Sequence, residues 1–237
     1  MMLLGTVSTA GAETVINRNY PVQPAQTIHF RFDYPELIRV STWEKNEISI
    51  QGTVSINGGE NDDAFVLDGS TSGSVVSIQS EIRNIKNLPH RYTVMKDGKK
   101  ITFKNKAEWR TYKSEYHDKN NWISEGVDMD IVLEIKVPKN VATTLESVYG
   151  MVEVRDFSGP LVVEATYGGV DALLIENKTG ELKAETNYGQ IYSNLNLKFS
   201  NSVEEDFHTV VSAKVGSGSN YTFESKYGNV YLRRQVN

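Results

Sequence analysis

Apolar and polar residues alternate in short runs along most of the chain. The pattern is clear in residues 27–33, 38–43, 47–56 and 127–137, which are rich in β-branched residues and are separated by clusters of Asn, Gly, Asp and Ser. A period of two residues puts alternate side chains on opposite faces of an extended strand. The sequence therefore predicts an all-β protein built from many short strands.

A repeated signature dominates the C-terminal half. It consists of a Glu, two residues, Tyr-Gly, one further residue and a β-branched residue, and it begins at Glu146, Glu164, Glu185 and Glu224. The recurring pairs are Tyr149 and Gly150, Tyr167 and Gly168, Tyr188 and Gly189, and Tyr227 and Gly228. A period of about 20 residues is typical of stacked repeat proteins. The signature thus predicts a parallel β-solenoid, a β-helix-like stack of rungs, over residues 138–237.

The spacing and parity of the signature add detail to this prediction. The tyrosines are 18, 21 and 39 residues apart, and because 39 equals 18 plus 21, one rung is expected to lack the signature. In each unit the Tyr shares its parity with apolar positions such as Leu145, which places it at the edge of the core. The Gly is expected to form a corner through a positive φ or a tight bend. The Glu has the opposite parity and should face solvent.

Residues 83–126 differ in composition from the rest of the chain. They hold 11 Lys or Arg and 5 Asp or Glu, a charge of +6, whereas the remainder carries −11. A hairpin is expected around Asp97 and Gly98, followed by a short helix over residues 107–116. The segment is therefore expected to be an insertion in an N-terminal β part that spans residues 14–137.

This insertion combines basic and aromatic side chains, which allows two interpretations. They could form a contact surface for an acidic glycan or another anionic surface, or the aromatics could pack onto a sheet while the lysines are solvated. The candidate contact residues are Trp109, Tyr112, Tyr116, Trp122, Lys99, Lys100 and Arg110.

Residues 1–13 have the features of the end of a secretory signal peptide. A short apolar run is followed by small residues and an Ala-x-Ala site, so cleavage is expected after Ala12. No later stretch approaches the ~20 apolar residues of a membrane-spanning helix. We therefore expect an exported protein with one continuous domain over residues 14–237.

Composition and spacing argue against several kinds of chemistry. The net charge of −5 gives no support for nucleic-acid binding, and the absence of Cys excludes disulfides and thiol catalysis. No cofactor or metal is expected, because the four histidines are far apart and show no ligand spacing. Catalysis would need several acidic side chains to lie close together. The candidates are the repeated glutamates and four aspartates, Asp128, Asp130, Asp156 and Asp171.

Several segments resemble the bacterial putative-adhesin family of β-solenoid domains of unknown function. They are residues 39–50, 135–138 and 214–219 together with the Tyr-Gly units, and the last unit closes with residues 227–233. The resemblance covers most of the chain except residues 83–126. It implies an exported, envelope-associated protein, and it carries over no catalytic residues.

These observations predict a non-catalytic, adhesin-like protein of the periplasm, the outer membrane or the cell surface. Its long β face would bind an envelope protein or a glycan, and the sequence specifies neither that partner nor an oligomeric state. One alternative is a structural or assembly module of the envelope. Another is a β-helix enzyme that cleaves polysaccharides, for which fold analogy alone is a weak argument.

Overall fold

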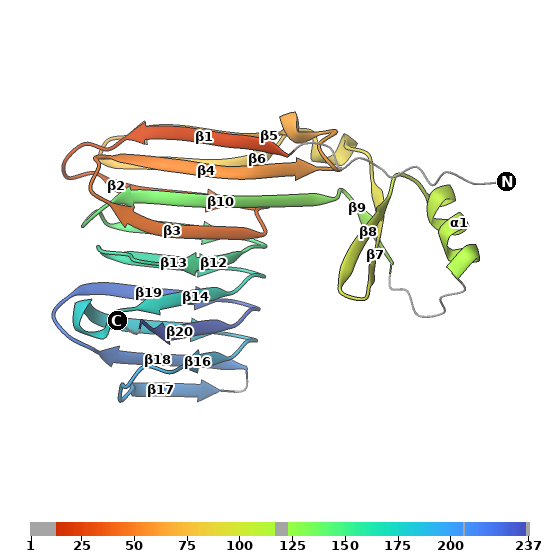
Figure 1. Cartoon of the computed structure of the whole chain (residues 1–237). Coiled ribbons are helices and arrows are strands. Elements are labelled where there is room, and N and C mark those ends of the chain that lie inside the picture. Colours follow the sequence, from red (N-terminus) through yellow and green to blue (C-terminus); the bar gives the residue numbers. More distant parts are fainter. Residues whose placement is uncertain (1–12, 117–122, 206, 236–237) are drawn as a thin grey trace.

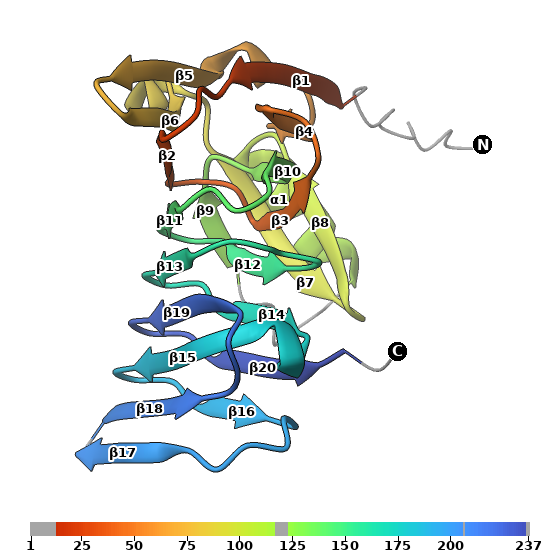
Figure 2. The same ribbon diagram turned by 90° about the vertical axis from the view of Figure 1, so that its left-hand side faces the viewer.

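The computed structural model describes residues 13–116, 123–205 and 207–235 and shows two large β-sheets that face each other (Figures 1 and 2). Sheet A has the strand order β1 (Thr14–Pro21), β4 (Glu47–Ile56), β10 (Met129–Pro138), β3 (Leu37–Trp43), β12 (Met151–Val154), β14 (Val170–Leu174), β20 (Val230–Arg234) and β16 (Ile191–Ser193). Sheet B has the order β17 (Ser200–Glu205), β18 (His208–Lys214), β15 (Thr179–Thr186), β19 (Ser219–Ser225), β13 (Leu161–Ala165), β11 (Thr143–Ser147), β2 (Thr27–Phe32), β6 (Val75–Ile82) and β5 (Phe65–Ser72). The predicted signal-peptide end lies outside the described residues, apart from Glu13.

The two sheets enclose one continuous hydrophobic core. Alternate residues of each strand point inward, as the burial of Ile38 and Val40 in sheet A and of Phe30 and Phe32 in sheet B shows. Phe223 of β19 is also fully buried. Each large side chain removed from water contributes roughly 2 kcal/mol. The alternation read from the sequence therefore reflects strands with one face in this core.

The prediction of a parallel β-solenoid is wrong, although the protein is all-β. Both sheets are mixed: parallel pairs such as β11/β13 and β12/β14 form their centres, and antiparallel pairs lie at both ends of sheet B and at one end of sheet A, whose other end is the parallel pair β20/β16. These antiparallel pairs are β1/β4, β4/β10 and β5/β6 at one end, and β15/β18 and β17/β18 at the other.

The Tyr-Gly units also do not stack in chain order. Strand β19 of the fourth unit lies between β13 and β15, and β20 lies between β14 and β16. The described residues of the 39-residue interval before the fourth Tyr therefore contain no hidden rung. Instead, it holds the antiparallel hairpin β17–β18, which pairs with β15. Leu195, Leu197 and Phe199 precede this hairpin and pack against the core.

The insertion projects from one edge of the two sheets (Figure 1). It contains a three-stranded sheet C, ordered β8 (Lys99–Phe103), β7 (Arg91–Lys96) and β9 (Ile123–Gly126), and helix α1 (Lys106–Tyr116). Asp97 and Gly98 form the turn between β7 and β8, both with positive φ. The described residues also include three short 3-10 helices, which are η1 (Asp62–Ala64), η2 (Ile85–Asn87) and η3 (Glu176–Lys178).

Candidate functional site

Each Tyr-Gly pair forms a corner where the chain leaves sheet B and enters sheet A. The glycines are needed here because neighbouring corners approach each other very closely. A Cβ on Gly168 would lie 1.9 Å from the Gly150 carbonyl oxygen, and one on Gly189 would lie 1.9 Å from that of Gly228. None of the four corner glycines has a positive φ. Close backbone approach, rather than a positive φ, therefore selects Gly at these positions.

Buried hydroxyl groups hold neighbouring corners together. Ser225 Oγ donates a hydrogen bond to the Gly168 carbonyl at 2.7 Å, and Thr186 Oγ1 donates one to the Gly228 carbonyl at 3.0 Å. Each hydroxyl also accepts a bond from the backbone N–H of the glycine three residues later, at 2.9 and 3.0 Å. The corners are thus fixed relative to one another by side-chain as well as backbone hydrogen bonds.

The aromatic side chains of the corners form one continuous stack, which we call the aromatic ladder. In spatial order its members are Tyr34, Tyr149, Tyr167, Tyr227, Tyr188 and Phe207. The ring centroids of the four signature tyrosines are 5.1 to 5.4 Å apart, and their planes are within 11° of parallel. Tyr34 and Phe207 extend the stack at 6.2 and 5.6 Å.

The sequence reasoning missed both end members of the ladder. Tyr34 lies in the β2–β3 connection, two residues after the inward-facing Phe32, and Tyr149 has the same offset from the inward-facing Ser147. No Gly follows Tyr34, so the Tyr-Gly signature does not mark it. Its offset from Phe32 is the signal that could have identified it. Phe207 lies between β17 and β18 and has no comparable signal.

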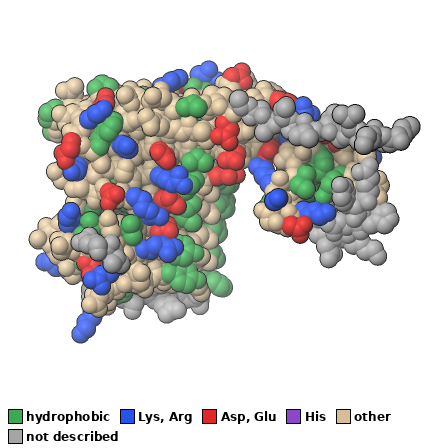
Figure 3. Space-filling model, in the orientation of Figure 1, with side chains coloured by type: hydrophobic (Ala, Val, Ile, Leu, Met, Phe, Trp, Pro, Cys, Tyr) green, Lys and Arg blue, Asp and Glu red, His purple; other side chains and the backbone are tan. Residues whose placement is uncertain are grey.

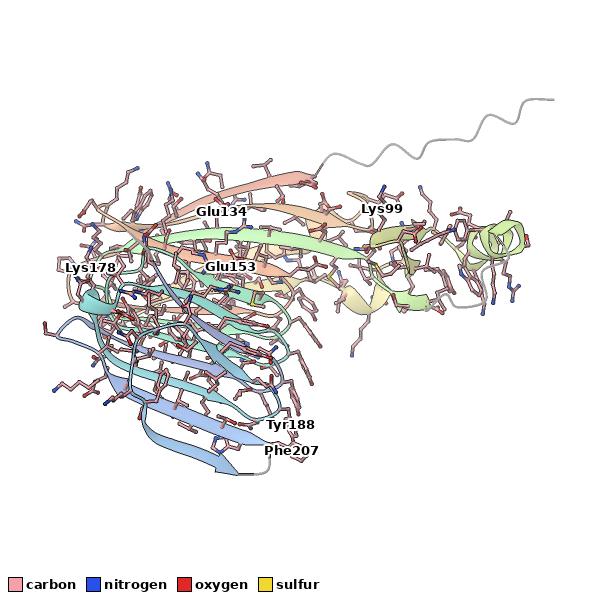
Figure 4. The ribbon with its side chains drawn as sticks, turned by 60° about the horizontal axis from the view of Figure 1, so that its bottom comes forward. Lys99, Glu134, Glu153, Lys178, Tyr188 and Phe207 are labelled. Atoms are coloured by element: carbon pink, nitrogen blue, oxygen red, sulfur yellow. The ribbon has the colours of Figure 1, made fainter. Side chains whose placement is uncertain are left out.

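The prediction that the tyrosines lie at the core edge is wrong. The four signature tyrosines are 44% to 59% exposed, and Phe207 is 70% exposed. The alternation of inward and outward side chains does not reach the Tyr because the strand ends before it: β11 stops at Ser147, and the chain then turns. Figure 4 shows Tyr188 and Phe207 together at the edge of the sheets, with Lys178 at the opposite edge. The signature thus displays its Tyr to solvent.

The phenol hydroxyls of the ladder are available to a ligand. Within the described part of the chain, the hydroxyls of the four signature tyrosines have no hydrogen-bond partner. By contrast, the buried Tyr221 hydroxyl donates to the Phe157 carbonyl at 2.9 Å. A phenol hydroxyl both donates and accepts hydrogen bonds, so the ladder presents a polar group at each of these corners.

The glutamates of the signature form a second row on the outer face of sheet B, beside the ladder. Strand register places Glu146, Glu164, Glu224 and Glu185 next to one another in that order. The two end members are compensated: Glu146 contacts His29 at 2.7 Å, while Glu185 contacts Lys183 at 2.7 Å and His208 at 2.8 Å.

The two middle members of this row form no ion pair among the described residues. Burial raises the pKa of the Glu224 carboxyl, and the neighbouring Glu185 and Glu164 raise it further. The hydrogen bond from Lys183 lowers the pKa of Glu185. Negative charge is therefore least compensated in the middle of the row, at Glu164 and Glu224.

A hollow of about 490 Å³ lies where the insertion meets the ladder. Tyr34, Glu36 and Tyr149 line it from the body, and Lys100 and Ser124 line it from sheet C. In Figure 3, hydrophobic side chains form a stripe down the edge of the body, and this edge faces the insertion across an open gap. The ladder is therefore one wall of a concave surface.

The structure places the predicted contact residues of the insertion in different surroundings. Trp109 and Tyr112 are half-buried, and the Tyr112 ring packs against Phe103 at 5.0 Å. Lys99, Lys100 and Arg110 are exposed. The Tyr116 side chain and Trp122 lie outside the described residues. These side chains remain a predicted contact surface.

The four aspartates considered for catalysis do not form one cluster, but Asp128 and Asp130 both lie near Glu36 at the hollow, where burial raises the pKa of the Glu36 carboxyl and the two aspartates raise it further. Asp171 is held by Arg155 and Arg233 on the outer face of sheet A, at 3.4 and 3.0 Å. Asp128 pairs with Lys100 in the hollow, and Asp156 contacts Gln235 at 3.3 Å. Among the described residues, no group of three or more His, Asp or Glu side chains is arranged to hold a metal ion. Nor does any described helix have the length and apolar character needed to cross a membrane.

No protein-family model matches the chain, and no curated protein sequence matches it. The fold is similar to that of a putative cell adhesion protein from Clostridium sporogenes ATCC 15579, with a TM-score of 0.50 and 10% identity over 94% of this chain and 100% of that one. A putative adhesin from Bacteroides fragilis NCTC 9343 gives a TM-score of 0.24 at 11% identity, over 94% of this chain and 98% of that one, and supports no argument. At such low identity the first likeness shows a shared fold alone.

Proposed function

We propose that this chain is a non-catalytic, adhesin-like binding protein that is exported and displayed in the cell envelope or at the cell surface. Its contact surface is the aromatic ladder, and its partner is an envelope protein or a glycan. The signal-peptide features of residues 1–13 support export. The similarity in fold to a structure named as a putative cell adhesion protein supports the adhesin-like role.

The exposed ladder is the observation that carries this proposal. Soluble proteins rarely leave large contiguous aromatic surfaces in water, and such surfaces mark binding sites. Tyr is well suited to this use because it offers a large, rigid contact area at a small cost in conformational entropy. Here the backbone corners fix the rings, so that little ordering remains to be done when a partner binds.

The charged groups near the ladder favour binding over catalysis. Glu146 and Glu185 are engaged by basic side chains, and Asp128 is held by Lys100 and by the Thr102 hydroxyl. A glycan-cleaving site needs a proton donor and a second carboxylate on opposite sides of one bond. The row of glutamates instead lies along a single face. We expect the protein to release no reducing sugars from polysaccharides.

Binding of the purified chain to cells and to isolated envelopes tests the proposal. We expect Tyr167→Ala/Tyr227→Ala to weaken binding by about tenfold or more, because buried aromatic contacts dominate interfaces. The matched control is Tyr192→Ala, which disrupts the stacked pair Tyr192–Tyr231 on the outer face of sheet A and should leave binding unchanged. Unchanged binding of the ladder variant would refute the ladder as the contact surface. If Lys99→Ala/Arg110→Ala alone abolished binding, the predicted surface on the insertion would take its place.

A further inference from the structure

The aromatic ladder presents ring edges rather than ring faces. Each interior tyrosine has another ring on both of its faces, with centroids 5.1 to 6.2 Å apart, so the edges and hydroxyls are the parts of the rings that the stack covers least. The edge of an aromatic ring is the positive end of its quadrupole, and the phenol hydroxyl is a donor. Such a surface attracts oxygen atoms. The chemistry of the ladder therefore favours a ligand rich in hydroxyl groups.

The repeat of the ladder indicates the kind of polymer that fits it. Successive tyrosines are 5.1 to 5.4 Å apart, and one extended six-membered sugar residue spans about one such step. A peptide strand presents side chains to one face every ~6.6–6.8 Å, so it would lose register with the corners within a few steps. An extended linear glycan can place one sugar residue at each corner, whereas a peptide strand cannot keep this spacing.

Sheet C supplies a second polar wall opposite the end of the ladder formed by Tyr34 and Tyr149. Its strand register aligns Thr102, Thr93 and Ser124 in one row across the sheet. Thr93 and Ser124 line the hollow beside Tyr34 and Tyr149. The insertion stands over this part of the edge (Figure 3), so a slender extended chain has easier access to it than a globular surface.

The charges around the ladder indicate the sign of the charge that a ligand should carry. Glu164 and Glu224 are in direct register beside it and have no ion-pair partner among the described residues. Glu36 and Asp128 lie at the hollow, where Lys100 is already paired with Asp128. Lys226 lies 5.6 Å from the centre of the Tyr227 ring and offsets one of these charges. The surroundings remain net negative and complement a cationic ligand.

We propose that the aromatic ladder binds an extended linear polysaccharide whose sugars carry free amino groups. The glycan lies along the ladder from the hollow toward Phe207. Its hydroxyl oxygens contact the tyrosine edges and hydroxyls, and those ammonium groups that point toward sheet B face the row at Glu164 and Glu224. This inference deepens the proposed function and rests on it.

Calorimetric titration with oligosaccharides of one length tests this specificity. At about pH 6 the amines of a glucosamine oligomer are protonated and ordinary glutamates are ionised. We expect the glucosamine oligomer to bind about tenfold more tightly than the fully N-acetylated oligomer, and an oligogalacturonate to bind more weakly still. Equal binding of all three sugars, or preference for the galacturonate, would overturn the proposal. Oligolysine binding as tightly as the glucosamine oligomer would also overturn it, since charge alone would then suffice.

Variants separate the two contributions. Tyr167→Ala/Tyr227→Ala should weaken binding of the glucosamine oligomer by about tenfold or more, while Glu164→Gln/Glu224→Gln should weaken it by about threefold and abolish the preference for the free amine. Tyr192→Ala is the control and should bind normally. Suppose the ladder variant loses binding to envelopes but binds the glucosamine oligomer normally. The proposed function then stands and this assignment of the ligand fails. If the ladder variant still binds both the envelopes and the glucosamine oligomer normally, the proposed function and the assignment of the ligand both fail.

Discussion

The corners of the body and the insertion are both rich in aromatic residues, but the two regions use them in opposite ways. In the body, four tyrosines stand in solvent as a nearly parallel stack. In the insertion, Tyr112 of helix α1 packs against Phe103 of β8 with the rings tilted by 47°. The rings of the body are held in place by the hydrogen bonds between neighbouring backbone corners. The rings of the insertion are held by side-chain packing between helix α1 and sheet C. The same residue type thus displays a surface in one region and builds a small core in the other.

The largest expected difference in stability is between alanine variants of two phenylalanines, one in the core of the body and one in the insertion. Phe223 is completely buried between the sheets, and Phe223→Ala should lower the free energy of unfolding by about 3–5 kcal/mol because it leaves a cavity. Phe103 is half-buried in the insertion, so Phe103→Ala should loosen α1 and sheet C with a smaller global effect. Urea denaturation combined with hydrogen exchange measures both. Equal global losses would show that the insertion is as essential to stability as the core.

The next largest expected difference in stability is between alanine variants of two glycines. Gly168→Ala forces a Cβ against the Gly150 carbonyl and should cost about 1–3 kcal/mol or more, through overpacking of backbone that cannot move. Gly126, at the end of β9, has open space within 4 Å of the point where a Cβ would stand, and its φ is not positive, so Gly126→Ala should be nearly neutral. Thermal unfolding of the two variants compares them directly. A neutral Gly168→Ala would mean that the corners can separate.

Exposed and packed aromatics should also differ in stability. Tyr167→Ala removes two stacking contacts from an exposed ring and should cost about 1 kcal/mol. Trp109→Ala removes a half-buried ring that packs within the insertion, and its cost should appear as faster hydrogen exchange in α1 with little change in the body. Faster exchange throughout sheet B in the Trp109 variant would contradict this separation.

The smallest expected effects concern two glutamates with opposite pKa shifts. At the base of the insertion, Lys104 and Arg91 lower the pKa of Glu60, so its ionised form stabilises the fold at neutral pH and that stability is lost as the pH falls. Beside the ladder, the raised pKa of Glu224 means that its ionised form costs stability at neutral pH, and the cost disappears on acidification. Glu60→Gln should therefore lower stability at pH 7 and Glu224→Gln should raise it, each by well under about 1 kcal/mol. Both differences from the unsubstituted protein should vanish at acid pH.

The sequence was sufficient to predict the strands and the Tyr-Gly corners, because period-two alternation and a recurring signature are local properties. It was not sufficient to predict the stacking order, because the four units are so alike that Tyr227 fits beside Tyr167 as well as Tyr188 does. The exposure of the tyrosines was mispredicted because alternation holds only within a strand and β11 ends at Ser147. The uncompensated Glu224 became visible only when register placed it between Glu164 and Glu185.

The position of the fourth Tyr-Gly unit constrains how the molecule assembles. Strands β15 and β16 are synthesised before β19 and β20, yet β19 and β20 separate them from β13 and β14. The third unit therefore cannot join the earlier ones as it leaves the ribosome; it must wait until residues 219–234 have been made and inserted. Long-range closures of this kind slow folding and leave strand edges unpaired in the meantime. If the chain is exported as proposed above, this delay would keep the third and fourth units from folding until translocation of the chain is nearly complete.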